Sequence, residues 1–186
     1  GREILSRQER RLKGWWGYGI GSATMLLAGM VVTVLALNGP LRPEPWYDPR
    51  YAIPLFGMIL GNAMTGISLG LDGLTSLVGR ERAAIEAQLT LGATRWRALR
   101  PIAQRALRTG FTPMLNSMAA AGVVFLPGMM TGQILSGVAP EQAVKYQILV
   151  LFLIAGASGL GVLTAVLASI WRLTDDRHRL RLDRLA

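Results

Sequence analysis

Several oxygen- and sulfur-bearing side chains lie in stretches of this sequence that otherwise carry no charge, and they are the groups that could do chemistry. Amide and hydroxyl oxygens suit hard cations, whereas thioether sulfurs suit soft ones. A proline beside glycine interrupts a helix, and freed backbone is tolerated in a hydrophobic segment only inside protein or along a cavity. The candidates for lining a path through the protein are Asn62, Asn116, Pro127, Met129, Met130, Thr131 and Gln133.

These candidates also have plainer interpretations. The break at Pro127 is equally consistent with a packing kink near one end of a helix, and methionines most often fill gaps in a core. An amide such as Asn62 needs a partner in hydrocarbon, so it faces another helix or a water-filled path. Both interpretations stay open on the sequence, and metal ligands stay unassigned.

The sequence lacks the groups on which most catalytic sites depend. It has no cysteine and a single histidine, His178, which lies in a charged tail and is interpreted as solvated. It contains no Gly-x-x-x-x-Gly-Lys-Ser/Thr loop, so it is not expected to hydrolyse ATP itself. The chain is therefore predicted not to be an enzyme and to bind no cofactor of its own.

Four long uncharged runs must position these groups. Of all residues 51% are hydrophobic and only 17% are charged, and the charges cluster between the runs. About 20 apolar residues cross a hydrocarbon core of about 30 Å, and each run is that long. The sequence predicts an all-α integral membrane protein, with residues 1–186 as a single transmembrane domain. Its four transmembrane helices are expected at about 16–37, 51–71, 112–134 and 146–171.

The net charge of +9 is distributed as in a membrane protein and not as in a nucleic-acid-binding protein. Most Lys and Arg residues lie in 1–14, in 80–108 and after residue 171, whereas the loops at 38–50 and 135–145 hold few. Basic loops stay on the cytoplasmic side of a membrane. Both termini and residues 80–108 are therefore predicted to be cytoplasmic, in a multi-pass protein of the cell inner (plasma) membrane.

Small residues four positions apart predict close helix packing in the second run. Gly57 pairs in this way with Gly61, and Gly66 pairs with Gly70. Such spacing lets the backbones of two helices approach closely in lipid.

Residues 80–108 predict a cytoplasmic helix-turn-helix. Residues 80–91 are good helix formers without Gly or Pro, and Gly92 can adopt the left-handed conformation that ends a helix. Thr94 can cap the next helix, which carries Leu99 and Ile102 towards Pro113. An apolar turn ringed by arginines can dock in a groove on a partner. The alternative is an amphipathic helix lying on anionic lipid headgroups.

The spacing of Glu86-Ala87, Gly92 and Ile102 resembles the cytoplasmic coupling motif of ABC importer permeases, which contacts the ATPase subunit. Longer strings extend the resemblance. The segments 53–66, 86–94, 126–133 and 143–148 together look like the FetB-type iron-export ABC transporter permease family and its plant aluminium-tolerance relatives. Members of that family carry further spans ahead of the region corresponding to Gly1, so the present sequence is expected to be a fragment.

The resemblance implies a permease subunit that pairs with a separate ABC ATPase (nucleotide-binding) subunit and with a second permease copy as a homodimer. ATP would act through the partner subunit, and the cargo would be a metal ion, chiefly iron, moving outward. Plant relatives are linked to sugar nucleotides, so a non-metal substrate is the first alternative. The second alternative is a membrane scaffold without transport activity. Association with a P-loop ATPase would distinguish a transporter from such a scaffold.

Overall fold

The computed structural model describes residues 15–41, 49–121, 128–175 and 180–181. Within these ranges the chain consists of helices joined by short turns, with an isolated bridge between Thr174 and Leu180. The predicted all-α class is therefore confirmed for the described residues. In chain order the elements are α2 (Trp15–Ala36), the π-helical turn η1 (Leu37–Leu41), α3 (Pro49–Arg80), α4 (Arg82–Thr90), α5 (Arg95–Ala120), α6 (Gly128–Leu135) and α7 (Pro140–Leu173).

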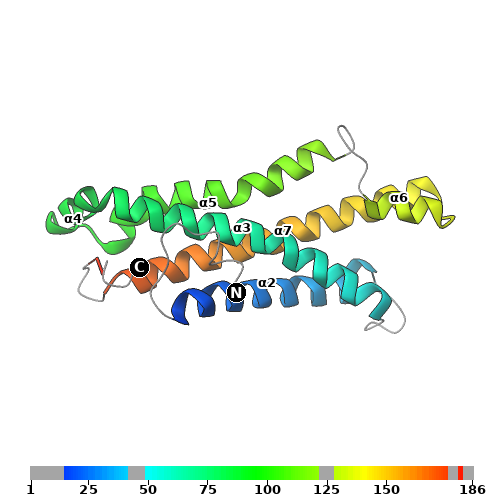
Figure 1. Cartoon of the computed structure of the whole chain (residues 1–186), viewed down its shortest axis with the longest axis horizontal. Helices are drawn as coiled ribbons and strands as arrows, with labels where there is room; N and C mark the ends of the chain where they lie inside the picture. The colour runs from blue at the N-terminus through cyan, green and yellow to red at the C-terminus, as the bar shows by residue number, and fades with distance from the viewer. Residues whose placement is uncertain (1–14, 42–48, 122–127, 176–179, 182–186) are drawn as a thin grey trace.

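The four long helices lie side by side along the long axis of the molecule, with α4 at one end and α6 at the other (Figure 1). Helix α3 is central, because it packs against α2, α5 and α7. Helices α3 and α7 run in the same direction, and α2 and α5 run in the opposite direction (Figure 1). The bundle thus joins the α4 end to the α6 end through continuous helices.

Three helical stretches are long and apolar enough to cross a membrane: Gly19–Gly39, Ala52–Arg80 and Pro140–Leu173. They correspond to the first, second and fourth predicted spans. The second and fourth of these helices, α3 and α7, are longer than predicted because charged residues do not end them. Helix α3 continues nine residues past Leu71, the predicted end, and α7 begins at Pro140 with Glu141 in its first turn. An acidic residue there is favoured by the helix dipole.

The third predicted span, 112–134, is not confirmed, and residues 122–127 within it lie outside the described residues. Thr112 and Pro113, the expected start of a new helix, lie inside α5, which runs without a break from Arg95 to Ala120. A separate helix, α6, begins at Gly128. The apolar part of α5 from Gly110 onward is only about 16 Å long at 1.5 Å per residue, so four continuous spans are not found among the described residues.

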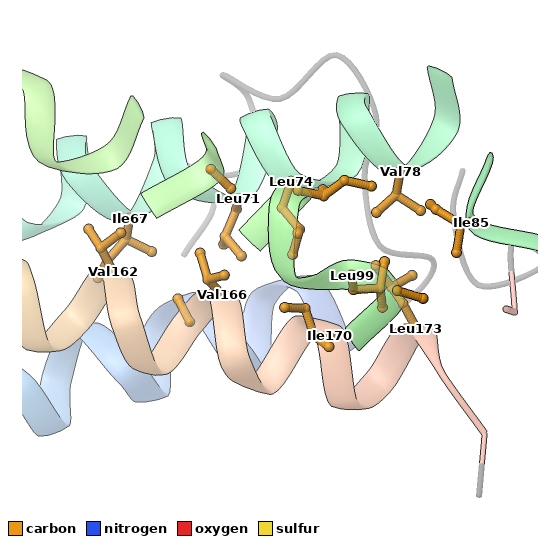
Figure 2. Close-up of a cluster of buried hydrophobic side chains, with 14 of the residues drawn as sticks. Ile67, Leu71, Leu74, Val78, Ile85, Leu99, Val162, Val166, Ile170 and Leu173 are labelled. Atoms are coloured by element: carbon orange, nitrogen blue, oxygen red, sulfur yellow. The ribbon is translucent and has the colours of Figure 1, made fainter. Parts of the chain in front are cut away.

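A core of aliphatic side chains joins α3, α5 and α7 near the α4 end. Figure 2 shows Leu71, Leu74 and Val78 of α3 pointing toward Val166 and Ile170 of α7. The α3 residues recur at three- and four-residue spacing, which puts them on one face of that helix. This core extends α3 past the predicted end of its span, because the same face stays buried as far as Val78.

Glycines bring the backbones of α3 and α5 together beside α7. A Cβ atom added to Gly110 would lie 2.6 Å from a methyl carbon of Val162 and 3.0 Å from the carbonyl oxygen of Gly66. One added to Gly70 would lie 3.0 Å from Val162. The predicted close packing at Gly66 and Gly70 is confirmed. The matching prediction for Gly57 and Gly61 is not, because a Cβ there would meet nothing within 4 Å.

Gly110→Ala should destabilise the bundle by about 1–3 kcal/mol, the usual cost of overpacking a filled core. The neighbours are partly backbone, so the helices must separate to admit the methyl group. Gly156→Ala is the matched control, because a Cβ at Gly156 of α7 meets nothing within 4 Å. Thermal unfolding in detergent should show a lower melting temperature for the first variant only. Equal melting temperatures would contradict close packing at Gly110.

Candidate functional site

The turn between α4 and α5 is built by local sequence. Gly92 has a φ of +85°, a conformation that favours glycine. Its N–H donates to the carbonyl of Leu89 at 3.1 Å, and the N–H of Ala93 donates to the carbonyl of Gln88 at 3.0 Å. This pair of bonds is the Schellman arrangement that ends helices. The Thr94 hydroxyl then accepts from the N–H of Arg97 at 3.4 Å and caps α5, as the sequence predicts.

Both helices of this unit are anchored in the core of the bundle. Ile85 of α4 and Leu99 of α5 point into the cluster that contains Val78 and Leu173 (Figure 2). Ile102, a predicted coupling residue, is only 2% exposed and belongs to the same cluster. Ile102 therefore holds α5 in place and is not available to a docking partner.

The tip of the unit is open and partly apolar. Leu91 is 87% exposed and Trp96 is 45% exposed, although both are large hydrophobic side chains. Ala87 is also exposed. A surface hollow of about 500 Å³ lies beside the turn. Its lining residues are Gln88, Leu91, Gly92, Ala93, Arg97 and Pro101.

Exposed basic side chains begin at this tip and continue along α5. Arg97, Arg100 and Arg108 are exposed along α5. Glu86, another predicted coupling residue, pairs with Arg82 at 2.8 Å within α4, so its charge is balanced locally. An exposed apolar tip with a positive surround fits an apolar, acidic groove on another protein. It also fits an anionic lipid surface.

A two-pronged ion pair that was not predicted from the sequence ties Glu81, the residue just before α4, to α5. Arg105 donates from its two terminal nitrogens to the two carboxylate oxygens of Glu81, at 2.6 and 2.7 Å. The hydrogen bond from Arg105 lowers the pKa of the Glu81 carboxyl, and the same bond raises the pKa of the Arg105 guanidinium. The pair spans 24 residues of sequence, so no local pattern predicts it.

The predicted path residues do not form one cluster. Met129, Met130, Thr131 and Gln133 lie on α6, and Met129 packs against a second core with Val150 of α7. Pro127 lies outside the described residues. Asn62 and Asn116 are exposed on α3 and α5, and the Asn62 amide donates to the carbonyl of Met58 at 2.9 Å.

One buried polar group on α7 was also missed. Gln147 is 7% exposed, and its side-chain carbonyl oxygen has no hydrogen-bond partner within the described part of the chain. Glu141, Gln142 and Lys145 precede this amide on α7, so nothing in the local sequence marks Gln147 as the one that is buried. Across the described residues no three His, Asp or Glu side chains come together in a way that could hold a metal ion.

The structure has three helical stretches long and apolar enough to cross a membrane and a helix-turn-helix anchored in the core. These features are those of a helical membrane protein. Residues 1–173 match the family described as "Uncharacterised protein family (UPF0014)". The chain belongs to this family of membrane proteins, and the resemblance to FetB-type permeases is confirmed.

Curated relatives come from bacteria and plants. The chain is 36% identical over 178 residues to the UPF0014 membrane protein slr1647 of Synechocystis, covering 96% of this chain and 66% of the relative. It is 35% identical over 153 residues to the "Probable iron export permease protein FetB" of Escherichia coli, covering 82% and 58%. It is 36% identical over 140 residues to "Protein ALUMINUM SENSITIVE 3" of Arabidopsis thaliana, covering 75% and 50%.

The chain thus spans between half and two thirds of the length of these three relatives. No solved structure matches the chain.

Breaking the Glu81–Arg105 pair should loosen the α4–α5 unit without unfolding the bundle. In Glu81→Gln we expect a broader distance distribution between spin labels on cysteines introduced at Ala84 and Gln104, measured by electron spin resonance. Acid should act in the same way on the wild type. The pKa of Glu81 is lowered, so the pair persists at neutral pH and is lost only as the pH falls through that lowered value.

Arg82→Gln is the control, because it breaks an ion pair that lies wholly within α4. It should leave the distance distribution unchanged. A Glu81→Gln distribution identical to that of the wild type would mean that the core contacts alone position α4.

Proposed function

We propose that this chain is a membrane-spanning permease subunit of an ABC transporter that exports metal ions. ATP is hydrolysed by a separate nucleotide-binding subunit. The observation that carries the proposal is the exposed apolar tip at Leu91, held at one end of the bundle by the buried anchors Ile85, Leu99 and Ile102. Similarity to a probable iron export permease supports a metal ion as the cargo.

The unit has the properties that a coupling element needs. An element that transmits force must be exposed where it is pushed and rigid where it joins the moving helices. Leu91 and Trp96 supply the exposed surface, and the Glu81–Arg105 pair ties the first residue before α4 to α5. Displacement of the tip would therefore reach α3 and α7 through their shared core.

The metal cargo is supported by the kind of ligands available. A neutral set of amide and hydroxyl oxygens binds a hard cation weakly, which allows release during transport. Thr131 and Gln133 on α6 offer such oxygens, and the thioethers of Met129 and Met130 are nearby in sequence. A non-metal substrate such as a sugar nucleotide remains the alternative cargo. A scaffold without transport would need no such ligands.

The permease subunit is proposed to form a homodimer in the inner membrane. Gly57, Gly61, Asn62 and Asn116 are exposed on α3 and α5, although small and amide residues usually face another helix in lipid. A second permease copy would cover them. The α4–α5 tip and both termini would face the cytoplasm, because arginine-rich segments stay on that side.

Gly92→Val should weaken docking of the nucleotide-binding subunit. A β-branched residue at a φ of +85° is strained by about 1–2 kcal/mol, which is roughly a 5- to 30-fold change in the population of the native turn. We expect a comparable loss of association with the ATPase subunit that co-purifies with the wild type, measured in nanodiscs. ATP hydrolysis by the complex should become insensitive to added metal.

Gly92→Asn is the matched control, because asparagine adopts the left-handed conformation more readily and no atom would obstruct its Cβ. It should retain most of the association. Both variants should insert into the membrane as the wild type does. Wild-type coupling in Gly92→Val, or failure of any P-loop ATPase to co-purify with the wild type, would favour a scaffold or a lipid-facing helix.

A further inference from the structure

The described residues that follow α7 return to the end of that helix. Thr174 and Leu180 form an antiparallel bridge, and the backbone N–H of Arg181 donates to the carbonyl of Leu173 at 2.9 Å. The last carbonyls of an α-helix have no partner within the helix, and this bond satisfies one of them. We name Leu180 and Arg181 the C-terminal clasp. The clasp lies beyond residues 1–173, the part of the chain that matches the family.

The side chain of Leu180 joins the clasp to the core of the bundle. The five residues between Thr174 and Leu180 are Asp, Asp, Arg, His and Arg, so Leu180 is the first apolar residue after Leu173. It packs against the aliphatic cluster that contains Ile85 of α4 and Leu99 of α5. Removal of apolar surface from water favours this contact.

The ion pair in the clasp contributes less than this apolar contact. Nη1 of Arg181 lies 3.7 Å from Oδ2 of Asp175, and the two side chains are 41% and 39% exposed. Exposed ion pairs stabilise a fold only weakly. The packing of Leu180 therefore matters more to the clasp than the ion pair does.

The clasp adds a contact at the helix of the α4–α5 unit that has the least buried surface. Ile85 is the buried residue of α4, and the rest of that helix is exposed or half-buried. Leu173, the last residue of α7, is fully buried in the same cluster, and Figure 2 shows it at the same end of the cluster as Ile85 and Leu99. Leu180 packs on this cluster from beyond α7, so it links α7 to the unit that carries the exposed tip.

We propose that Leu180 is a positioning residue that couples the α4–α5 unit to α7. With Leu180 packed on the cluster, displacement of the tip at Leu91 moves the end of α7. Without this contact, the unit moves relative to α7 and less of the displacement reaches the bundle. The role in coupling rests on the proposed export function, whereas the positioning of the unit does not.

The positioning is tested by distances between spin labels on the full chain in nanodiscs, with no ATPase subunit present. The chain has no cysteine, so the labels attach only to cysteines introduced at Ala84 of α4 and Leu167 of α7, both of which are exposed. Leu180→Ala and Leu180→Asp should broaden the distance distribution. The aspartate variant should broaden it more, because it places a charge against an apolar cluster. Leu180→Met should keep the wild-type distribution, because it conserves volume and apolarity.

Two controls separate loss of the clasp contact from general damage. Leu135→Asp introduces the same charge on α6, where the side chain is 83% exposed, and should leave the distribution unchanged. Arg181→Gln removes the ion pair with Asp175 but keeps the backbone bond to Leu173, and it should also leave the distribution unchanged. A wild-type distribution in Leu180→Asp would overturn the positioning role.

The role in coupling is measured on the complex with the ATPase subunit. Leu180→Asp should still bind that subunit, because the exposed tip at Leu91 is unchanged. It should reduce the stimulation of ATP hydrolysis by Fe²⁺ by about 2- to 30-fold, the range for residues that link two sites.

A purely structural contact would lower the melting temperature without changing this stimulation. Broadened distances with wild-type stimulation by Fe²⁺ would therefore overturn the role in coupling. Failure of the proposed export function has a different signature. Broadened distances in Leu180→Asp, in preparations from which no ATPase co-purifies, would support the positioning of the unit by Leu180 and remove the ABC function only.

Discussion

The close approach of α3 and α5 beside α7 is the contact on which the rest of the structure depends. It exists because Gly66, Gly70 and Gly110 have no side chain, so Val162 fills the space where their Cβ atoms would lie. Glycine weakens a helix, and here the loss is offset by contact between backbones over several turns. With α5 held against α3, its buried face must carry Leu99 and its other face must carry the arginines.

That contact links the two ends of the molecule. At one end, α5 continues back to Thr94 and supports the exposed tip at Leu91. At the other end, α7 continues back to Pro140 and supports α6. The tip and α6 are therefore joined through the packed helices α5, α3 and α7. Figure 1 shows α4 at one end of the bundle and α6 at the other.

Local chemistry made the helix-turn-helix predictable. Gly92 and Thr94 adopt the conformations that their residue types favour in any surroundings. The turn and the helix cap can therefore be predicted from a few neighbouring residues. Charge was a poorer guide to helix ends. Asp72 does not end α3, because one face of that helix stays buried as far as Val78. Pro113 does not start a helix, because Ala106 and Gly110 already bind α5 to α3 before that point.

Contacts between residues that are far apart in the sequence could not be predicted from it. Glu81 and Arg105 are ordinary surface residues until the fold sets them 2.6 Å apart, and Gln147 is one amide among several until the fold buries it. Conversely, Asn62 and Asn116 were grouped with α6 by chemistry alone, although they lie exposed on other helices. Membership of the UPF0014 family shows that the chain is a membrane protein. Its partners are inferred from the chemistry of its surface.

A photo-crosslinking amino acid at Leu91 tests whether a nucleotide-binding subunit docks on the α4–α5 tip. Leu135, which is 83% exposed on α6 at the other end of the bundle, is the matched position. In growing cells, light should join the Leu91 variant to a protein that mass spectrometry identifies as a P-loop ATPase, and the Leu135 variant should give no such product. Crosslinks from Leu91 to lipid alone, or the same ATPase product from both positions, would contradict the account.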